Sequence, residues 1–355
     1  MPPIIGLLLP AWALALLALA LLSYALRRWP TLLHSSKPRH PVWSRIFAIA
    51  HRGGRQATPE NTLASFRRAA SLADAIELDV WLTQDGEVVV LHDGSLQRVC
   101  GRAEHVEALR SDALPPIRQA ASDGFGQGEG QPAIAAHELR MPLLKDVLAL
   151  LKHEAPGVAL MVEFKGKQPE LRAKVRSLLR EYGVMPRAAA FSLDSKTNAR
   201  LRAECPEFFL CSDVSRIAMI FLLYYLGLIG VVPTSFFDPI FGAKFSKLKD
   251  LGFLQRIPVV RSLVRAPTPA PAFRPLLLSH LPALAQPTSL QWHVAEQIGA
   301  ITEAPKLFEH LQRRGVLVWC LGVNTDEQLQ HATALGVDSV LTDVPEWLAK
   351  ARQGR

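Results

Sequence analysis

Short runs of apolar residues alternate with segments of helical periodicity along most of the chain. The expected strands in the first part cover residues 46–50, 75–80, 88–91, 158–164 and 188–192. The expected helices between them cover residues 60–73, 142–153, 168–182 and 194–204. The apolar runs are nearly continuous, which is typical of parallel strands that are covered on both faces. This alternation predicts a parallel β/α fold.

The alternation resumes near the C-terminus after a long break. Helices are expected at 303–314 and 325–335, and strands at 316–323 and 339–341. Two segments, 208–211 and 290–294, compete for the role of the sixth strand. Eight strands fit the pattern, and a (β/α)8 barrel of about 250 residues with additions accounts for the 355 residues of the chain.

The overall charge indicates an anionic partner. The formal net charge is +8 and the pI is near 9.5, which favours nucleic acid, an anionic membrane surface or a phosphate-bearing substrate. The sequence has no basic low-complexity tail and no zinc-finger spacing, so nucleic acid ranks last. The four cysteines show no metal-ligand spacing and are interpreted as ordinary thiols.

The N-terminal segment is predicted to be a membrane anchor. Residues 1–26 contain no charged side chain, and the apolar run is long enough to cross a bilayer, which takes about 20 residues. A cleaved signal peptide is the rival interpretation, but no basic residue precedes the run. We therefore expect a transmembrane helix over 1–29 and a basic linker over 30–45, with the rest of the chain on the cytoplasmic side.

Two insertions are expected within the barrel, which we place at 46–350. Residues 101–140 contain several Gly and Pro residues and are interpreted as a small cap. Residues 213–287 begin with an uncharged apolar run at 217–232, followed by a basic amphipathic stretch at 241–265. A single membrane crossing there would divide the barrel, so we expect this insertion to dip into the bilayer or lie on it, with membrane lipids as partners.

Carboxylates on two expected strands are candidate metal ligands. Glu77 and Asp79 are two residues apart, so a strand places both on one face. Two buried carboxylates repel each other and need a cation, and Mg²⁺ or Ca²⁺ prefers such oxygen ligands. Glu163 and Lys165 share a face in the same way, where Glu163 would add a third carboxylate and Lys165 would neutralise a phosphate. The plain alternatives are a polar edge strand and a surface ion pair.

Two histidines follow expected strands. His51 and Arg52 end the first strand, before two glycines that allow close approach of the backbone to a ligand. His92 and Asp93 end the third expected strand. A pair of imidazoles near a metal and a phosphate would supply a general base and a general acid. Asp93 would orient a neighbour or cap the following turn.

The ordered motifs resemble the glycerophosphodiester phosphodiesterases, a family of TIM barrels. They are His51-Arg52-Gly53, Pro59-Glu60-Asn61-Thr62, Glu77-Leu78-Asp79, His92-Asp93 and Glu163-Phe164-Lys165, and the late Asn324 and Thr342-Asp343-Val344-Pro345 also fit. The resemblance spans roughly residues 46–350. One departure is that Leu321 stands where the family often has a tryptophan, with Trp319 two residues earlier, which puts head-group selectivity in doubt.

The resemblance implies a role for each matched residue. Glu77, Asp79 and Glu163 would hold a divalent ion, Mg²⁺ or Ca²⁺, and His51 and His92 would be the acid and base. Three further residues would bind the substrate phosphate: Arg52, Lys165 and Asn61.

The implied function is metal-dependent hydrolysis of a glycerophosphodiester to an alcohol and a glycerol phosphate. With the apolar insertion, we expect a lipid-bearing substrate such as a lysophospholipid or a glycerophospho-N-acylethanolamine. The alternatives are a non-catalytic barrel that binds membrane or phospholipid, and a lyase that stops at a cyclic phosphate.

Overall fold

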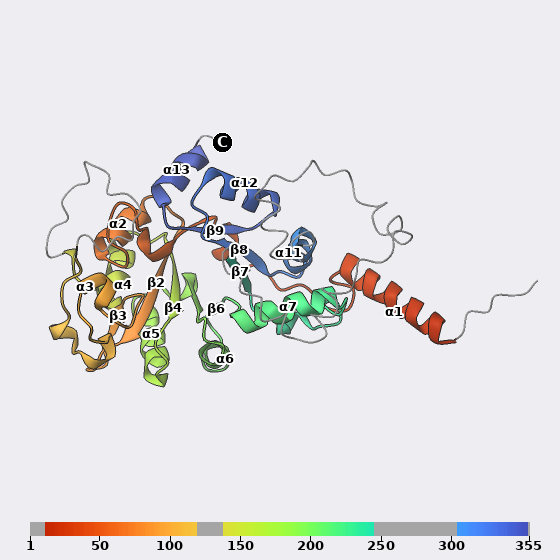
Figure 1. Ribbon diagram of the computed structural model, residues 1–355, viewed down its shortest axis with the longest axis horizontal. Helices are drawn as coiled ribbons and strands as arrows, with labels where there is room; N and C mark the ends of the chain where they lie inside the picture. The colour runs from red at the N-terminus through yellow and green to blue at the C-terminus, as the bar shows by residue number, and fades with distance from the viewer. Residues whose placement is uncertain (1–10, 119–137, 245–303, 354–355) are drawn as a thin grey trace, which may run out of the picture.

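The computed structural model describes residues 11–118, 138–244 and 304–353 (Figure 1). Eight parallel strands form the barrel: β1 (Ala48–Ala50), β2 (Ala75–Leu82), β4 (Ala159–Phe164), β5 (Ala188–Phe191), β6 (Phe209–Leu210), β7 (Ile240–Lys244), β8 (Leu317–Leu321) and β9 (Ser339–Thr342). They pair in the order β6-β5-β4-β2-β1-β9-β8-β7. A parallel bridge between Cys211 and Ile240 joins the two outer strands, so the barrel is nearly closed.

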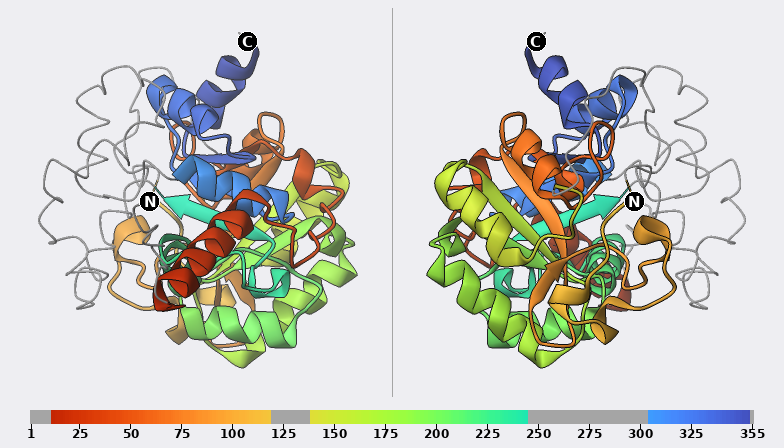
Figure 2. Two further views of the ribbon diagram at one scale, coloured as in Figure 1. Left: turned by 90° about the vertical axis from the view of Figure 1, so that its right-hand side faces the viewer. Right: turned by 90° about the vertical axis from the view of Figure 1, so that its left-hand side faces the viewer.

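Helices cover the outside of this barrel (Figures 1 and 2). They are α2 (Leu63–Ala70), α4 (Leu144–His153), α5 (Pro169–Glu181), α6 (Ser195–Glu204), α7 (Val214–Tyr225), α11 (Ala304–Arg313), α12 (Asp326–Ala334) and α13 (Pro345–Gln353). Two further helices are α1 (Ala11–Arg28) and α3 (Gln97–Cys100), and short 3₁₀ turns include η1 (Trp43–Arg45), η2 (His51–Gly53), η3 (Val106–Ala108), η4 (Ser111–Ala113), η7 (Met185–Arg187) and η8 (Thr234–Phe236).

Alternate residues of the strands divide between two cores. The outward residues of β2 pack under the helices with those of β4, in one large apolar cluster that includes Ile76 and Val162. The inward residues pack in the barrel interior, where Trp43 contacts Trp319 at 5.1 Å between ring centroids. Trp43 precedes β1 and therefore fills the end of the barrel where the strands begin. Polar side chains occupy the opposite end of the barrel, where the strands finish.

A strand forms where the third strand was expected, but it is not part of the barrel, so only its expected place among the parallel strands is wrong. β3 (Val88–Val90) pairs antiparallel with the end of β2, with Trp81 opposite Val89. Its connection to β2 is too short for a parallel crossover, which needs a dozen or more residues. β3 instead helps to form a small separate core with α3 and the described parts of the expected 101–140 cap.

The predicted insertion at 213–287 starts too early. Residues 214–244 form α7 and β7, a regular part of the barrel, and β7 pairs with β8 along its whole length. Apolar residues of α7 are buried because they pack against β7 and α11, where Phe221 lies 5.9 Å from Phe241 between ring centroids. The sixth strand is β6, one of the two candidates. The other candidate, 290–294, and the basic stretch beyond residue 244 lie outside the described residues.

The N-terminal helix α1 extends away from one side of the barrel (Figure 1). None of the helices in the described ranges is long and apolar enough to cross a membrane, so the predicted transmembrane helix over 1–29 is not found there. Residues 1–10 of that prediction lie outside the described residues. The helix contacts the segment after α7, where Ser23 Oγ donates to the carbonyl of Gly227 at 3.0 Å.

Candidate active site

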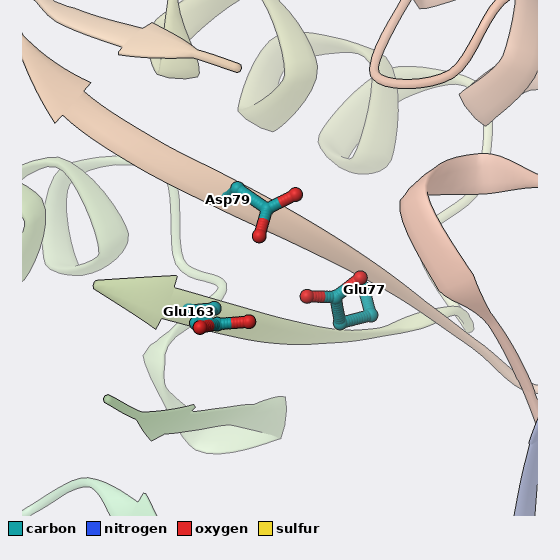
Figure 3. A group of neighbouring side chains, drawn as sticks. All are labelled: Glu77, Asp79 and Glu163. Atoms are coloured by element: carbon teal, nitrogen blue, oxygen red, sulfur yellow. The ribbon is translucent and has the colours of Figure 1, made fainter. Parts of the chain in front are cut away.

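Three carboxylates converge where β2 and β4 end. Glu77 and Asp79 lie on the inward face of β2, and the strand register places Asp79 directly opposite Glu163 of β4. Each offers an oxygen within 4.8 Å of the others, and all three side chains are buried (Figure 3). The strand alternation that buries Ile76 and Leu78 under the helices therefore directs these acids into the barrel.

Burial and mutual repulsion disfavour the ionised forms of the carboxyl groups in this cluster. Loss of solvation, followed by the charges of Asp79 and Glu163, raises the pKa of Glu77 well above its ordinary value. Burial and Asp79 also raise the pKa of Glu163. Burial opposes ionisation of Asp79 too, but Lys165 and Arg52 outweigh it and lower the pKa of that carboxyl. The cluster therefore contains more negative charge than its own cations balance.

Two cations and an amide contact the carboxylates directly. Lys165 Nζ lies 2.6 Å from Glu163 Oε1 and 3.3 Å from Asp79 Oδ1. Arg52 Nε lies 3.4 Å from Asp79 Oδ2, and Asn61 Nδ2 donates to that same oxygen at 2.9 Å. Arg52 and Lys165 are thus beside the acids, where a phosphate would sit. The amide of Asn61 faces Asp79, so it orients a carboxylate.

An unusual backbone turn positions Arg52. Arg52 and Asn61 have φ values of 54° and 55°, in the left-handed region that non-glycine residues seldom adopt. In this conformation the Arg52 amide donates to Glu77 Oε2 at 3.0 Å. Gly53 follows with φ of 75°, and a Cβ there would lie 2.5 Å from Ser65 Oγ. Gly53 therefore permits the close packing of this turn against α2, and Gly54 permits its close approach to Pro345.

The predicted start of α2 is wrong by several residues. Thr58, which precedes Pro59, has the sequence pattern of an N-cap for the helix expected at 60–73, but the helix begins at Leu63 with Thr62 as its N-cap. Thr62 and Ser65 bond each other's backbone amides reciprocally, at 3.1 Å in each direction. The left-handed Asn61 prevents an earlier helical turn, and its side chain contacts the acid cluster instead.

His51 is held by a network that our site prediction did not include. Its Nδ1 lies 2.6 Å from Asp343 Oδ1, beyond the end of β9. Asn324 and Arg55 hold Asp343 in turn, at 2.8 Å to Oδ2 and 2.9 Å to Oδ1. An ionised carboxylate only accepts hydrogen bonds, so Nδ1 carries the proton and Nε2 is left as the basic nitrogen. That Nε2 lies 3.9 Å from Glu77 Oε2.

The surroundings of His51 favour its neutral form. Burial lowers its pKa, and the hydrogen bond to Asp343 opposes that effect without cancelling it. Asp343 is itself buried, but its bonds to His51 and Arg55 hold its pKa well below the usual range. The ring is therefore fixed in one orientation and available to accept a proton. The late Asn324 and Asp343 matches in the sequence were the available signal for this network.

His92 has a similar partner on the other side of the cluster. Its Nδ1 lies 2.6 Å from Asp93 Oδ1, and Trp81 Nε1 donates to its carbonyl at 3.3 Å. Asp93 thus orients its neighbour, whereas of the two roles we had favoured a cap of the following turn. Its other oxygen accepts from Arg98, which also donates to Glu60 at 2.7 Å. A positive charge on the His92 ring would favour the ionised forms of Asp79 and Glu163, although burial and Asp79 keep the pKa of Glu163 raised.

The carboxylate set fits a divalent cation. Glu77 Oε1 is buried and accepts no hydrogen bond within the described part of the chain, and Asp79 Oδ1 has the Lys165 ammonium 3.3 Å away but no hydrogen bond of good geometry. Buried polar atoms are rarely left in this state, because the loss of hydration costs about 1–3 kcal/mol. An ion bound by carboxylate oxygens, of the Mg²⁺ or Ca²⁺ type, would satisfy both atoms.

Trp319 does not line this site. It is fully buried in the barrel interior against Trp43, whereas Leu321 is the last residue of β8 and is partly exposed. The departure from the family pattern therefore leaves a leucine at the end of β8. The tryptophan two residues earlier belongs to the core.

Known proteins resemble this chain in sequence and in fold. Residues 51–347 match the glycerophosphoryl diester phosphodiesterase family. The chain is 31% identical over 328 residues to a Mus musculus protein named lysophospholipase D GDPD3, covering 92% of this chain and 86% of the relative. It is 26% identical over 329 residues to the Homo sapiens lysophospholipase D GDPD1, covering 91% and 90%.

A solved Oleispira antarctica phosphodiesterase, in complex with the product sn-glycerol-3-phosphate, has a similar fold. Its TM-score is 0.54 at 18% identity, covering 88% of this chain and 99% of that one. This likeness confirms the expected TIM-barrel fold. The extent of the sequence matches, which include all the ordered motifs from His51 to Pro345, shows that the chain belongs to the glycerophosphoryl diester phosphodiesterase family.

Proposed function

We propose that this phosphodiesterase hydrolyses lysophospholipids to an alcohol and lysophosphatidic acid, and glycerophospho-N-acylethanolamines, as related substrates, to an N-acylethanolamine and glycerol phosphate. The convergence of Glu77, Asp79 and Glu163 between two aspartate-oriented histidines carries the catalytic part of the proposal. The relatives named lysophospholipase D support the substrate class.

The chain's own residues supply proton transfer and phosphate binding. His51 accepts a proton at Nε2 from the attacking hydroxyl, which is the free glycerol hydroxyl or water, while Asp343 stabilises the ring that becomes charged. Arg52 and Lys165 bind the phosphate oxygens and offset the charge that grows on them. His92, held by Asp93, donates a proton to the departing alcohol as its bond to phosphorus breaks.

A bound divalent ion, Mg²⁺ or Ca²⁺, would polarise the phosphate and lower the pKa of the attacking hydroxyl. Glu77, Asp79 and Glu163 would hold it. If the glycerol hydroxyl attacks, water must open the resulting cyclic phosphate, with the two histidines in exchanged roles.

Exposed apolar side chains at the mouth of the barrel support a lipid substrate. Leu193 follows β5 and Val214 follows β6, and they are 48% and 47% exposed. Their loops are joined where Ser195 Oγ donates to Asp213 Oδ1 at 3.0 Å. Both residues therefore lie at the end of the barrel that carries the acid cluster, where an acyl chain could cover them.

We also propose that the protein attaches to a membrane through α1 and the basic residues that follow it. Exposed apolar residues of α1 (Leu19, Leu21 and Leu22) lie close in sequence to the basic residues that follow. By the sequence's charge distribution we assign the barrel to the cytoplasmic side of the bilayer.

Product analysis tests the substrate class. Lysophosphatidylcholine and glycerophosphocholine are incubated with the protein, with and without chelator, and the products are identified by mass spectrometry. We expect lysophosphatidic acid and choline from the lipid in the presence of metal, at a higher rate than products from the soluble diester. A preference for the soluble diester would contradict the lipid assignment, and accumulation of a cyclic phosphate would indicate a lyase.

A surface variant separates the lipid assignment from catalysis. Leu193→Asp should slow turnover of the lysolipid and leave turnover of glycerophosphocholine unchanged. Met219→Asp is the matched control, because Met219 is 45% exposed but lies in the middle of α7, outside both the mouth and the segment after α7. Equal effects of the two variants on the lysolipid would exclude a specific contact at the mouth.

A further inference from the structure

A basic cavity lies between α1, α7 and α11, on a different part of the barrel from the acid cluster. Its volume is about 600 Å³. The described residues that line it include four cationic ones: Arg27, Arg28, Lys306 and Arg313. Glu309 is the one acid among the described lining residues, and it pairs with Arg313. The cavity therefore has an excess of positive charge.

Contacts of the α1 helix build this cavity. Leu26 is buried against Gly230, where a Cβ on the glycine would lie 2.3 Å from the leucine Cβ. On the other side, Arg313 Nη1 donates to the carbonyl of Arg28 at 3.3 Å, and His310 Nδ1 lies 3.4 Å from the carbonyl of Arg27. These contacts hold the end of α1 beside α11 (Figure 2), which brings basic residues distant in sequence into one site.

A buried polar atom in the cavity wall is left without a partner. His310 lines the cavity and its residue is only 2% exposed, and its Nε2 makes no hydrogen bond within the described part of the chain. Such an atom usually has a partner. Because Nδ1 donates to the Arg27 carbonyl, the unprotonated Nε2 is an acceptor, and the hydroxyl of a singly protonated phosphate monoester in the cavity would supply its donor.

Apolar side chains lie next to the cavity. Tyr24 and Trp29, at the end of α1, are 61% and 54% exposed, and Leu228 and Val231 of the segment after α7 are 42% and 50% exposed. His34 Nε2 lies 3.0 Å from the Val231 carbonyl, which holds the two segments together. A ligand that suits both features has an anionic head and an apolar body.

We propose that this cavity binds the phosphate headgroup of an anionic membrane phospholipid, with a phosphate monoester as in phosphatidic acid. Arginine is well suited to phosphate, because its planar guanidinium donates two parallel hydrogen bonds. The lipid chains would lie against the exposed apolar residues of α1 and of the segment after α7. The site would attach the barrel to an anionic bilayer and is separate from the catalytic centre.

Vesicle binding by the full chain tests this proposal. Binding is measured in chelator, so that no turnover occurs and the result does not depend on the proposed substrate. The vesicles contain phosphatidylcholine alone, with phosphatidic acid, or with phosphatidylserine at matched surface charge. We expect the tightest binding to the phosphatidic acid vesicles. Equal binding to the two anionic vesicles would overturn the assignment to a phosphate monoester.

Arginine variants locate the site. Arg27→Gln with Arg313→Gln should weaken binding to phosphatidic acid vesicles about tenfold, because both charges line the cavity. The double variant Arg176→Gln, Arg180→Gln is the matched control, with the same loss of charge at two arginines of α5 that pair with Glu207. Equal effects of the two double variants would overturn the proposal.

Two further measurements distinguish a loss of binding from a loss of structure, and a lipid site from a site for free phosphate. Arg27→Gln alone retains the backbone contact to His310 and should still weaken binding, whereas unchanged binding by this variant would count against the site. Inorganic phosphate at millimolar concentration should not displace the protein from phosphatidic acid vesicles. Displacement would show a site for free anions and would overturn the lipid assignment.

Discussion

Asp79 and Glu163 lie opposite each other across β2 and β4, and the ammonium group of Lys165 contacts both. This arrangement puts one lysine between two buried carboxylates while Glu77 adds a third acid. The excess negative charge makes the cluster costly without a cation. Removing one of the charges or adding a divalent cation should therefore stabilise the folded protein.

Replacing Glu77 should stabilise the metal-free protein while removing activity. The raised pKa of Glu77 means that its charged form is disfavoured where it lies, and Glu77→Gln removes that charge with little change in shape. We expect the free energy of unfolding in chelator to rise by about 1 kcal/mol, and turnover to fall at least 10²-fold. Urea unfolding at pH 7.5 measures the first effect, and destabilisation would contradict our account of the repulsion.

Adding a divalent ion should stabilise the native protein through the same three acids. At an ion concentration about 100 times the dissociation constant, binding adds about 2.7 kcal/mol to the free energy of unfolding. Thermal unfolding with Mg²⁺ or Ca²⁺ after chelator treatment measures this effect. Glu163→Gln should abolish it, whereas Glu87→Gln, at an acid that pairs with Lys145 and Lys174 on the surface, should not. A shift that persists in Glu163→Gln would place the ion elsewhere.

Asp343 should control the proton transfer by His51. Asp343→Asn removes the acceptor that holds Nδ1 protonated, so we expect kcat to fall by about 10²-fold or more with little change in KM. Because the bond to Asp343 raises the pKa of His51, its loss should move the acidic limb of the rate profile, which reports the general base, to lower pH. If the variant changed KM but left kcat and the pH profile unchanged, Asp343 would have only a structural role.

Stability should depend on pH through His310. Burial, with the charges of Arg314 and Arg313, lowers its pKa to about 4 from 6.5, although the Arg27 carbonyl opposes the shift. As the pH falls from 6.5 to 4 the unfolded chain takes up the proton first, so the free energy of unfolding decreases by at most about 3 kcal/mol. Above pH 6.5 the contribution is constant. Urea unfolding of His310→Gln should lack this slope, and the exposed His153→Gln should retain it.

Two glycine variants separate backbone strain from steric conflict. Gly53 and Gly86 have similar φ values of 75° and 77°, but an added Cβ meets Ser65 at Gly53 and nothing within 4 Å at Gly86. Gly86→Ala should cost about 1 kcal/mol of stability, and Gly53→Ala should cost 1–3 kcal/mol more, as overpacking typically does. Only Gly53→Ala should reduce turnover, because it displaces Arg52. Equal losses in both would show that close packing at Gly53 contributes nothing.

Local sequence alone determined the parallel β/α class and the pairing of acids on β2. Alternation at a period of two residues forces Glu77 and Asp79 to one face, and their apolar neighbours to the other, whatever the rest of the chain does. The same rule applies to Glu163 on β4 and to Lys165, which directly follows the strand. The cap of α2 was harder to locate, because Thr58 and Thr62 are both acceptable N-caps and only the left-handed Asn61 distinguishes them.

Only the tertiary structure decided which segments close the barrel and what holds the histidines. Residues 217–232 are uncharged because α7 buries one face against β7 and α11, and an apolar run has the same composition whether protein or lipid covers it. His51 and Asp343 are separated by 292 positions, and meet because β1 pairs with β9. Local patterns determine which way a side chain points, whereas strand order determines which distant side chain it meets.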